Sequence, residues 1–280
     1  MSGEFTVRHL RCGHCGTELP VMGRYITFQC ETCFRYWIIT GTGLEPLQVF
    51  RSPAPEDSEA ETLLLPFWVI LIDPHLLRNN VEQSVTNLQS LSATLSTTEI
   101  THETGDFDEL VNELTGVDVA SKRAELLHGI SQARKVPSGS ELTFLLDKIE
   151  NHDRYSIFVP AFQTTNTFAY LKIGKLLTRK QPPFRLVRAE DPGRPVMCVL
   201  HPEEAVQLMD FIFISTLPES IQESGDFLKD VRLNAASPPR LVELPFEIRG
   251  SALYSIIGGF EISSRLIELP HADKHISSRS

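Results

Sequence analysis

The sequence predicts an α+β protein in which a small β-type module at the N-terminus is followed by a mixed α/β body. Two CxxC pairs stand among β-prone segments in the first forty residues, and apolar runs of strand length alternate with helical patterns after residue 62. The 280 residues suffice for a substantial hydrophobic core. We expect the module at 1–50, an acidic flexible linker at 51–62, and a body at 63–280 with room for two subdomains.

Four cysteines form the two CxxC pairs, Cys12 with Cys15 and Cys30 with Cys33. Fourteen residues separate the pairs, just under the usual spacing for a tetrathiolate metal site. Each pair places two thiolates on one tight turn, and two such turns supply four soft ligands at the tetrahedral angles that Zn²⁺ accepts. The four cysteines are therefore predicted to ligate a structural metal ion.

The segments around these pairs are β-prone. Residues 25–28 alternate in character, and residues 34–39 are rich in aromatic and branched side chains. Gly13 and Gly16 give the first turn access to backbone angles that a side chain resists, whereas the second turn contains no glycine. With its four cysteines, the segment from about 8 to 50 resembles a zinc ribbon. This resemblance implies metal binding and says almost nothing about biological role.

Zn²⁺ is the expected metal, and iron in a rubredoxin-like site is the alternative, since four thiolates suit both ions. A thioredoxin-like redox pair is a weaker alternative because it normally has a single CxxC near a βαβ pattern. His14 lies within the first pair, where we expect a solvated side chain because four thiolates already complete the ligand set. Cys198 stands in the apolar run 196–200 and is interpreted as a core residue.

The chain is acidic, with 26 basic and 36 acidic residues and a formal net charge of −10. The segment 1–50 carries four arginines and four glutamates, so it lacks the positive charge on which nucleic-acid affinity depends. The stretch 171–194 is an exception, with seven basic residues against two acidic ones. A helix there places Lys172, Lys175 and Arg179 on one face, which suits either an anionic partner or a solvated surface.

Continuous apolar runs predict the strands of the body. The run 63–72 is typical of a strand buried on both faces. Further strands are expected at 155–162, 184–188, 196–200, 241–248 and 253–262. A proline followed closely by an aromatic residue recurs at Pro66, Pro160 and Pro245, either by chance or because related strands enter one sheet or two packed subdomains. Pro66 is expected at an edge or bend, since proline cannot donate to a sheet ladder.

Helical patterns separate these strands. The segment 121–134 has Ser121 as an N-cap and apolar residues on one face. The segment from 202 toward 214 begins with Pro202 and two glutamates, which are typical of a first helical turn. Other helices are expected at 106–114, 141–149 and 169–178. Together with the ribbon, this arrangement resembles uncharacterised bacterial zinc-ribbon proteins, a resemblance that implies no activity.

No catalytic motif stands out, and we expect neither catalytic residues nor a cofactor site other than the metal. The best local constellation is Asp73 and His75 around a proline, where an Asp-Pro turn explains the same residues. His201 precedes a helix start, and His271 and His275 fall in a polar tail. No apolar run approaches the roughly 20 residues of a membrane span, and no signal peptide is evident. We therefore expect a cytoplasmic protein with reduced thiols.

These features favour a zinc-binding protein-interaction or assembly (adaptor) protein. In this hypothesis the rigid ribbon presents Phe34, Tyr36 and Trp37 to a protein partner, unless these aromatic residues pack within the ribbon's own sheet. The alternative is a nucleic-acid-binding accessory protein that uses the ribbon and the basic stretch 171–194. An enzyme with a site near Asp73 is a third hypothesis.

Overall fold

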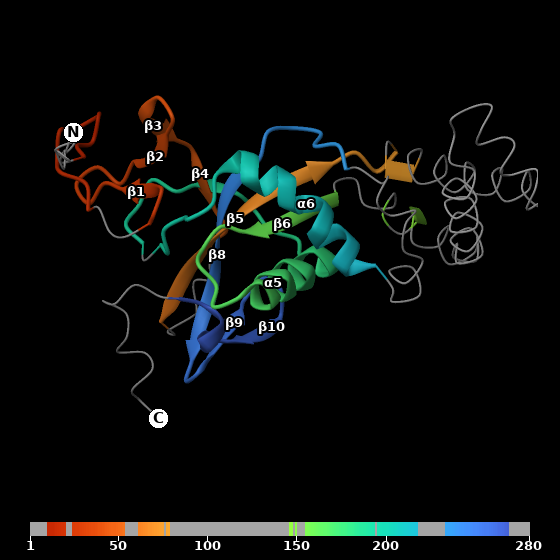
Figure 1. Cartoon of the computed structure of the whole chain (residues 1–280). Coiled ribbons are helices and arrows are strands. Elements are labelled where there is room, and N and C mark those ends of the chain that lie inside the picture. The colour runs from red at the N-terminus through yellow and green to blue at the C-terminus, as the bar shows by residue number, and fades with distance from the viewer. Residues whose placement is uncertain are drawn as a thin grey trace, which may run out of the picture. The chain divides into compact units, whose positions relative to one another are not determined.

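The computed structural model describes residues 10–20, 24–53, 61–75, 77–78, 146–147, 149, 155–193, 195–217 and 233–268 (Figure 1). The chain separates into two compact units. The first comprises Met1–Ile72, Ser156–Thr216 and Ala235–Ser280, and the second comprises Asp73–Tyr155 and Leu217–Asn234. The sheets and helices described below belong to the first unit, except that β6 begins at Tyr155, the last residue before the boundary.

The N-terminal sheet has three antiparallel strands, β1 (Thr27–Gln29), β2 (Tyr36–Thr40) and β3 (Gly43–Leu47), in the order β1-β2-β3. This sheet confirms the small β module expected at the N-terminus. Its hydrophobic cluster consists of Cys12, Leu19, Phe28, Cys30 and Trp37. Two of the four CxxC cysteines therefore belong to the hydrophobic core of the module. The packing of this core helps to determine where their sulfur atoms lie.

The body sheet is built from β4 (Val49–Arg51), β5 (Thr62–Ile72), β6 (Tyr155–Pro160), β7 (Val187–Arg188), β8 (Arg240–Arg249), β9 (Ala252–Ser255) and β10 (Phe260–Ser263). Five of these strands follow the order β10-β9-β8-β4-β7, and β5 pairs with both β8 and β6. The long strand β8 is the centre of this arrangement: it pairs with β4 in parallel and with β5 and β9 in antiparallel orientation.

Two helices accompany this sheet, α5 (Thr167–Lys180) and α6 (Pro202–Thr216) (Figure 1). Ile173 and Leu177 of α5 belong to the main hydrophobic cluster together with residues of β5 and β8. At Gly174 an added Cβ would lie 2.9 Å from the Ile212 side chain and 3.0 Å from the Phe158 carbonyl oxygen, so only glycine permits this close packing against β6 and α6. The structure thus confirms the predicted α+β class.

The prediction of a strand at 196–200 is wrong. Its backbone amides are used by different neighbours: Val196 donates to the Leu64 carbonyl, Cys198 to the Thr27 hydroxyl and Val199 to the Ala161 carbonyl. Because the bonds do not run along a single partner strand, no ladder forms. The strand expected at 184–188 is reduced to the two residues of β7.

Pro66 was expected at an edge or bend, and this prediction is also wrong. Pro66 lies within β5, opposite Glu243 of β8, and its carbonyl accepts a hydrogen bond from Ala161 just beyond β6. Pro160 and Pro245 lie in β6 and β8, the two strands that pair with β5. The three similar segments therefore do enter one sheet, side by side.

Several predictions concern residues outside the described ranges: the helices at 106–114 and 121–134, most of the acidic linker, His271 and His275. The domain boundaries stay a prediction. Of the helix expected at 141–149, residues 146, 147 and 149 are described and are helical. Within the described ranges, no helix combines the length and the apolar character that crossing a membrane requires.

Candidate metal centre

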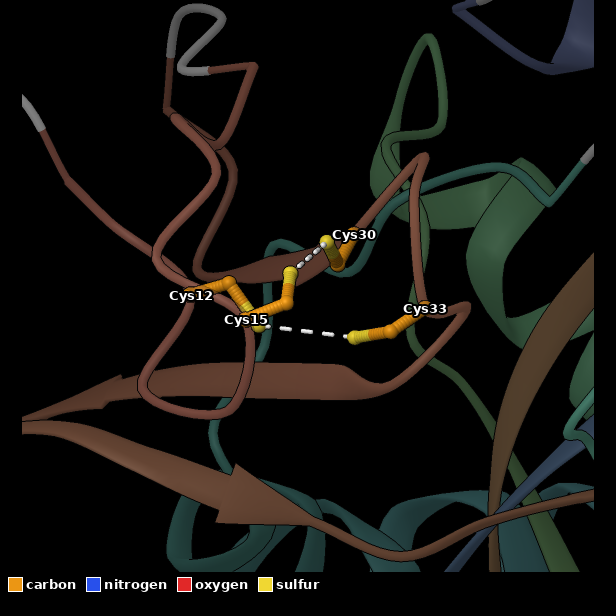
Figure 2. Close-up of side chains that lie close together, drawn as sticks. All are labelled: Cys12, Cys15, Cys30 and Cys33. Atoms are coloured by element: carbon orange, nitrogen blue, oxygen red, sulfur yellow. Dashed lines mark hydrogen bonds between the residues drawn. The ribbon is translucent and has the colours of Figure 1, made fainter.

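The four CxxC sulfurs converge on one point (Figure 2). All lie within 4.8 Å of one another, with Sγ–Sγ distances of 3.5 Å between Cys12 and Cys33 and 3.4 Å between Cys15 and Cys30. Each of these short distances joins one CxxC pair to the other. The structure therefore brings together all four residues that the sequence indicates as metal ligands.

Backbone hydrogen bonds shape two turns of similar form, which we call the first knuckle (residues 12–16) and the second knuckle (residues 30–34). In the first knuckle Gly16 donates to the Cys12 carbonyl at 2.8 Å, and in the second Phe34 donates to the Cys30 carbonyl at 2.8 Å. Both donors have a positive φ, 76° for Gly16 and 57° for Phe34. The second knuckle thus adopts the same left-handed conformation without the glycine that normally favours it.

Hydroxyl groups connect the knuckles at the exposed side of the cluster. The Thr17 hydroxyl donates to the Thr32 hydroxyl at 3.1 Å and also contacts the Cys15 sulfur at 3.3 Å. Hydrogen bonds with the side chain and backbone of Thr17 lower the pKa of Cys15 to about 6. Cys15 is exposed, so it is the thiol best placed to carry a charge before a metal binds.

The other sulfurs lie in a less polar setting. Burial raises the pKa of the Cys33 thiol to about 12. Burial also acts to raise the pKa of Cys12, but hydrogen bonds from the backbone of Cys15 and His14 outweigh it, so that the pKa is lowered. The four thiols therefore differ in how readily they lose a proton. Since a thiol binds metal only in its deprotonated form, a bound cation would stabilise the thiolates by neutralising their charge.

The donor set fits a tetrahedral tetrathiolate ion. Four sulfurs at about 2.3 Å from one Zn²⁺ stand about 3.8 Å from each other. The separations in the cluster, from 3.4 Å up to 4.8 Å, bracket that value. With four protein sulfurs, no coordination position is left for water or substrate, so the arrangement is suited to holding structure and not to catalysis.

The Trp37 side chain packs closely against Gly13 of the first knuckle. The Cα of Gly13 lies so close to the indole that an added Cβ would be 2.6 Å from Cη2 of Trp37. Trp37 is only 9% exposed and Tyr36 only 5%. For these two candidates the alternative to presentation holds, because Trp37 packs in the hydrophobic cluster of the N-terminal sheet and Tyr36 is buried. Phe34, the third candidate, is partly exposed.

Hydrogen bonds fix the N-terminal sheet to residues of the body. Ile26 donates to the Cys198 carbonyl at 2.8 Å, and the Cys198 amide donates to the Thr27 hydroxyl at 2.9 Å. The Gln29 side-chain amide donates to the Asp191 carbonyl at 3.2 Å. Cys198 is buried as predicted, and burial raises its pKa to about 12.

A charge network adjoins this junction, and its members Arg51 and Glu243 are buried. Arg51 bonds to Glu243 through Nε at 2.9 Å and to Asp191 through Nη1 at 2.7 Å. Burial raises the pKa of Glu243, an effect that the attraction of Arg51 opposes, and the Glu243 carboxylate in turn raises the pKa of Arg51. This network was not predicted from the sequence. A charged residue at an inward position of the apolar run 241–248 was the available signal.

No protein-family model, curated protein or solved structure matches the chain. The resemblance to a zinc ribbon therefore rests on the four clustered cysteines and on the three-stranded N-terminal sheet.

The remaining candidate residues have local structural roles. The Asp73 carboxylate accepts a hydrogen bond of 2.9 Å from the His75 amide. This bond is typical of the Asp-Pro turn that was considered for these residues as an alternative to a catalytic site. The His201 amide donates to the Glu204 carboxylate at 2.8 Å, which is half of a capping box at the start of α6. His14 is exposed.

Proposed function

We propose that the protein is a zinc-binding interaction or assembly protein in which a Cys₄ site has a structural role. The observation that carries this proposal is the convergence of the four sulfurs within 4.8 Å. The metal holds the two knuckles together, and their strands are bonded to the body through Thr27 and Gln29. Metal binding therefore stabilises a junction between two sheets as well as the ribbon itself.

A protein partner is supported by the exposed aromatic residues of the helices. Phe168 of α5 is 74% exposed and Phe211 of α6 is 62% exposed. Phe168 shares the α5 face of Lys172, Lys175 and Arg179, because the four residues follow at intervals of four, three and four. Aromatic residues and arginines are enriched at protein interfaces. We propose that this face of α5 and the exposed Phe211 of α6 together bind a partner surface with acidic and apolar groups.

The metal part of the proposal is tested by analysing full-length protein purified under reducing conditions. We expect one equivalent of zinc per chain and a marked drop in the melting temperature after chelation. If the sample contains stoichiometric iron, the site is the rubredoxin-like alternative and not a zinc site. A reduced sample without bound metal and with an unchanged melting temperature would remove the site altogether.

The interaction part is tested with a partner identified by cross-linking in the native host. Binding of the purified partner is measured for wild type and for Phe168→Ser and Phe211→Ser. Val187→Ser is a matched control, since Val187 is 38% exposed but lies on β7. We expect at least a tenfold loss of affinity for the helix variants only. Equal affinity for all four proteins would contradict the proposed face.

Nucleic-acid binding is the second candidate function, and one observation favours it. The ribbon and the basic stretch 171–194, which are separated in sequence, both contribute to a single groove, through Arg35 and Arg188 respectively. Binding to heparin that weakens steeply with salt would support this candidate, and no retention at low salt would exclude it.

A further inference from the structure

The groove lies beside the second knuckle and has a volume of ≈ 670 Å³. Its walls come from both knuckles, the start of β2, the end of β3 with the start of β4, and the segment around β7. The residues that bear on its chemistry are His14, Phe34, Arg35, Arg188 and Glu190. A cavity of this size accommodates a small organic ligand or a short segment of a polymer.

Phe34 is the least expected residue in this groove. It takes the left-handed conformation at φ 57°, at the position where the first knuckle has Gly16. A side chain in this conformation is strained, because its Cβ lies too close to the carbonyl oxygen. Phe34 belongs neither to the hydrophobic cluster of the N-terminal sheet nor to the main cluster of the body sheet. Since core packing does not account for the strained aromatic side chain, its place in the groove wall points to a ligand.

The charge of the groove departs from that of the chain. Arg35 and Arg188 are both exposed in its wall, within a protein whose formal net charge is −10. Arg188 has an acidic neighbour, Glu190, at 3.9 Å, where both side chains are largely exposed and the pair is weak. Arg35 forms no ion pair among the described residues. Two guanidinium groups and a partly exposed phenyl ring in one groove match a ligand with both an anionic and an aromatic part.

We infer that this groove binds a nucleotide unit, with the base stacked on Phe34 and the phosphate held by Arg35 and Arg188. The unit belongs either to a single-stranded nucleic acid or to a free nucleotide, since both present the same chemistry. Stacking on an aromatic side chain is tolerant of base identity, and arginine binds phosphate through two parallel hydrogen bonds. This inference rests on the second candidate function and specifies where and how the nucleic acid binds.

The test uses full-length, metal-loaded protein and two probes, a fluorescent eight-nucleotide oligothymidylate measured by anisotropy and AMP measured by calorimetry. Phe34→Gly removes the ring and also relieves the positive φ, so stability is expected to stay equal or rise while affinity falls about tenfold. Phe34→Tyr keeps a stacking ring and is expected to bind like wild type. Zinc content and melting temperature of every variant verify that the knuckle is intact.

Arginine variants test the phosphate contacts. Arg35→Gln and Arg188→Gln are each expected to weaken oligonucleotide binding and to reduce the salt slope by about one. Arg265→Gln is the matched control, because Arg265 is exposed on the 3₁₀ turn Ser264–Leu266 and does not line the groove. Lys172→Gln with Lys175→Gln tests the basic face of α5 separately.

The outcomes separate the inference from the function on which it rests. Loss of affinity confined to the Phe34→Gly, Arg35 and Arg188 variants supports the groove, and the stronger of the two probes identifies the source of the nucleotide. If wild type binds but only the α5 variant weakens, the groove inference is overturned while nucleic-acid binding stands. If neither probe binds at low salt, the nucleotide inference is overturned.

Discussion

The Tyr36 hydroxyl donates a hydrogen bond of 2.5 Å to Oε1 of Glu243, a residue 207 positions away in the sequence. Tyr36 begins β2 of the N-terminal sheet, and Glu243 lies in β8 at the centre of the body sheet. Glu243 is only 1% exposed, and its other oxygen accepts hydrogen bonds from Arg51. One carboxylate therefore links the N-terminal sheet to the body sheet, so that loss of Glu243 affects the hydrogen bonds of both Tyr36 and Arg51.

Replacing Glu243 with alanine is predicted to destabilise the protein by about 3–5 kcal/mol. Among the described residues, the buried Arg51 guanidinium would keep Asp191 as its one acidic partner, and an incompletely compensated buried charge is costly. Denaturant unfolding of the metal-loaded protein measures this change. Glu261→Ala is the control, since Glu261 forms a 3.5 Å ion pair with Arg249 in which both side chains are about half exposed, and a change below about 1 kcal/mol is expected. Similar losses for the two variants would contradict a special role for Glu243.

Local sequence signals were sufficient for much of the fold. The continuous apolar runs located β5 and β8, because strands buried on both faces carry few polar residues. The proline and two glutamates at 202–204 located the start of α6. The CxxC spacing indicated the four sulfurs, whose positions depend on two short turns and hence on nearby residues.

Long-range relationships were not accessible in the same way. Residues 196–200 have the composition of a strand, but a strand also needs one continuous neighbour, and their amides bond to three separate segments. Tyr36 and Trp37 have the composition of an interface, yet the first is buried against Glu243 and the second under Gly13. The groove at Phe34 joins residues more than 150 positions apart, so only the fold reveals it.

The two glycines of the first knuckle are predicted to respond differently to substitution. Gly13→Ala places a methyl group against the buried Trp37 ring and is expected to cost about 1–3 kcal/mol. Gly16 has no heavy atom within 4 Å of an added Cβ, so its constraint is the φ of 76° alone. Gly16→Asn should therefore be tolerated better than Gly16→Ala, since asparagine adopts this conformation more readily. Equal tolerance of asparagine at positions 13 and 16, measured by thermal unfolding, would refute this distinction.

Removing one ligand is predicted to abolish stoichiometric metal binding. Cys30 is fully buried in the hydrophobic cluster of the N-terminal sheet, so Cys30→Ser is expected to lose the metal and to lower the melting temperature of the protein. Cys198→Ala removes the cysteine outside the cluster and is expected to retain the metal. Elemental analysis and thermal unfolding distinguish the variants. Metal retained by Cys30→Ser, or lost from Cys198→Ala, would show that the ligand set is different.

After metal removal, Cys15 is predicted to be the first cysteine modified by iodoacetamide at pH 7. The thiolate is the reactive form, and a pKa of about 6 leaves most of Cys15 ionised at that pH, whereas the pKa values of Cys33 and Cys198 are about 12. The rate of Cys15 modification should fall as the pH drops through 6. Thr17→Val should move this midpoint upward, because hydrogen bonds with Thr17 lower the pKa. Peptide mass spectrometry assigns each site, and the metal-loaded protein should be protected. Equal rates for the four clustered cysteines, with a midpoint near 9, would instead mean that the knuckles open when the metal leaves.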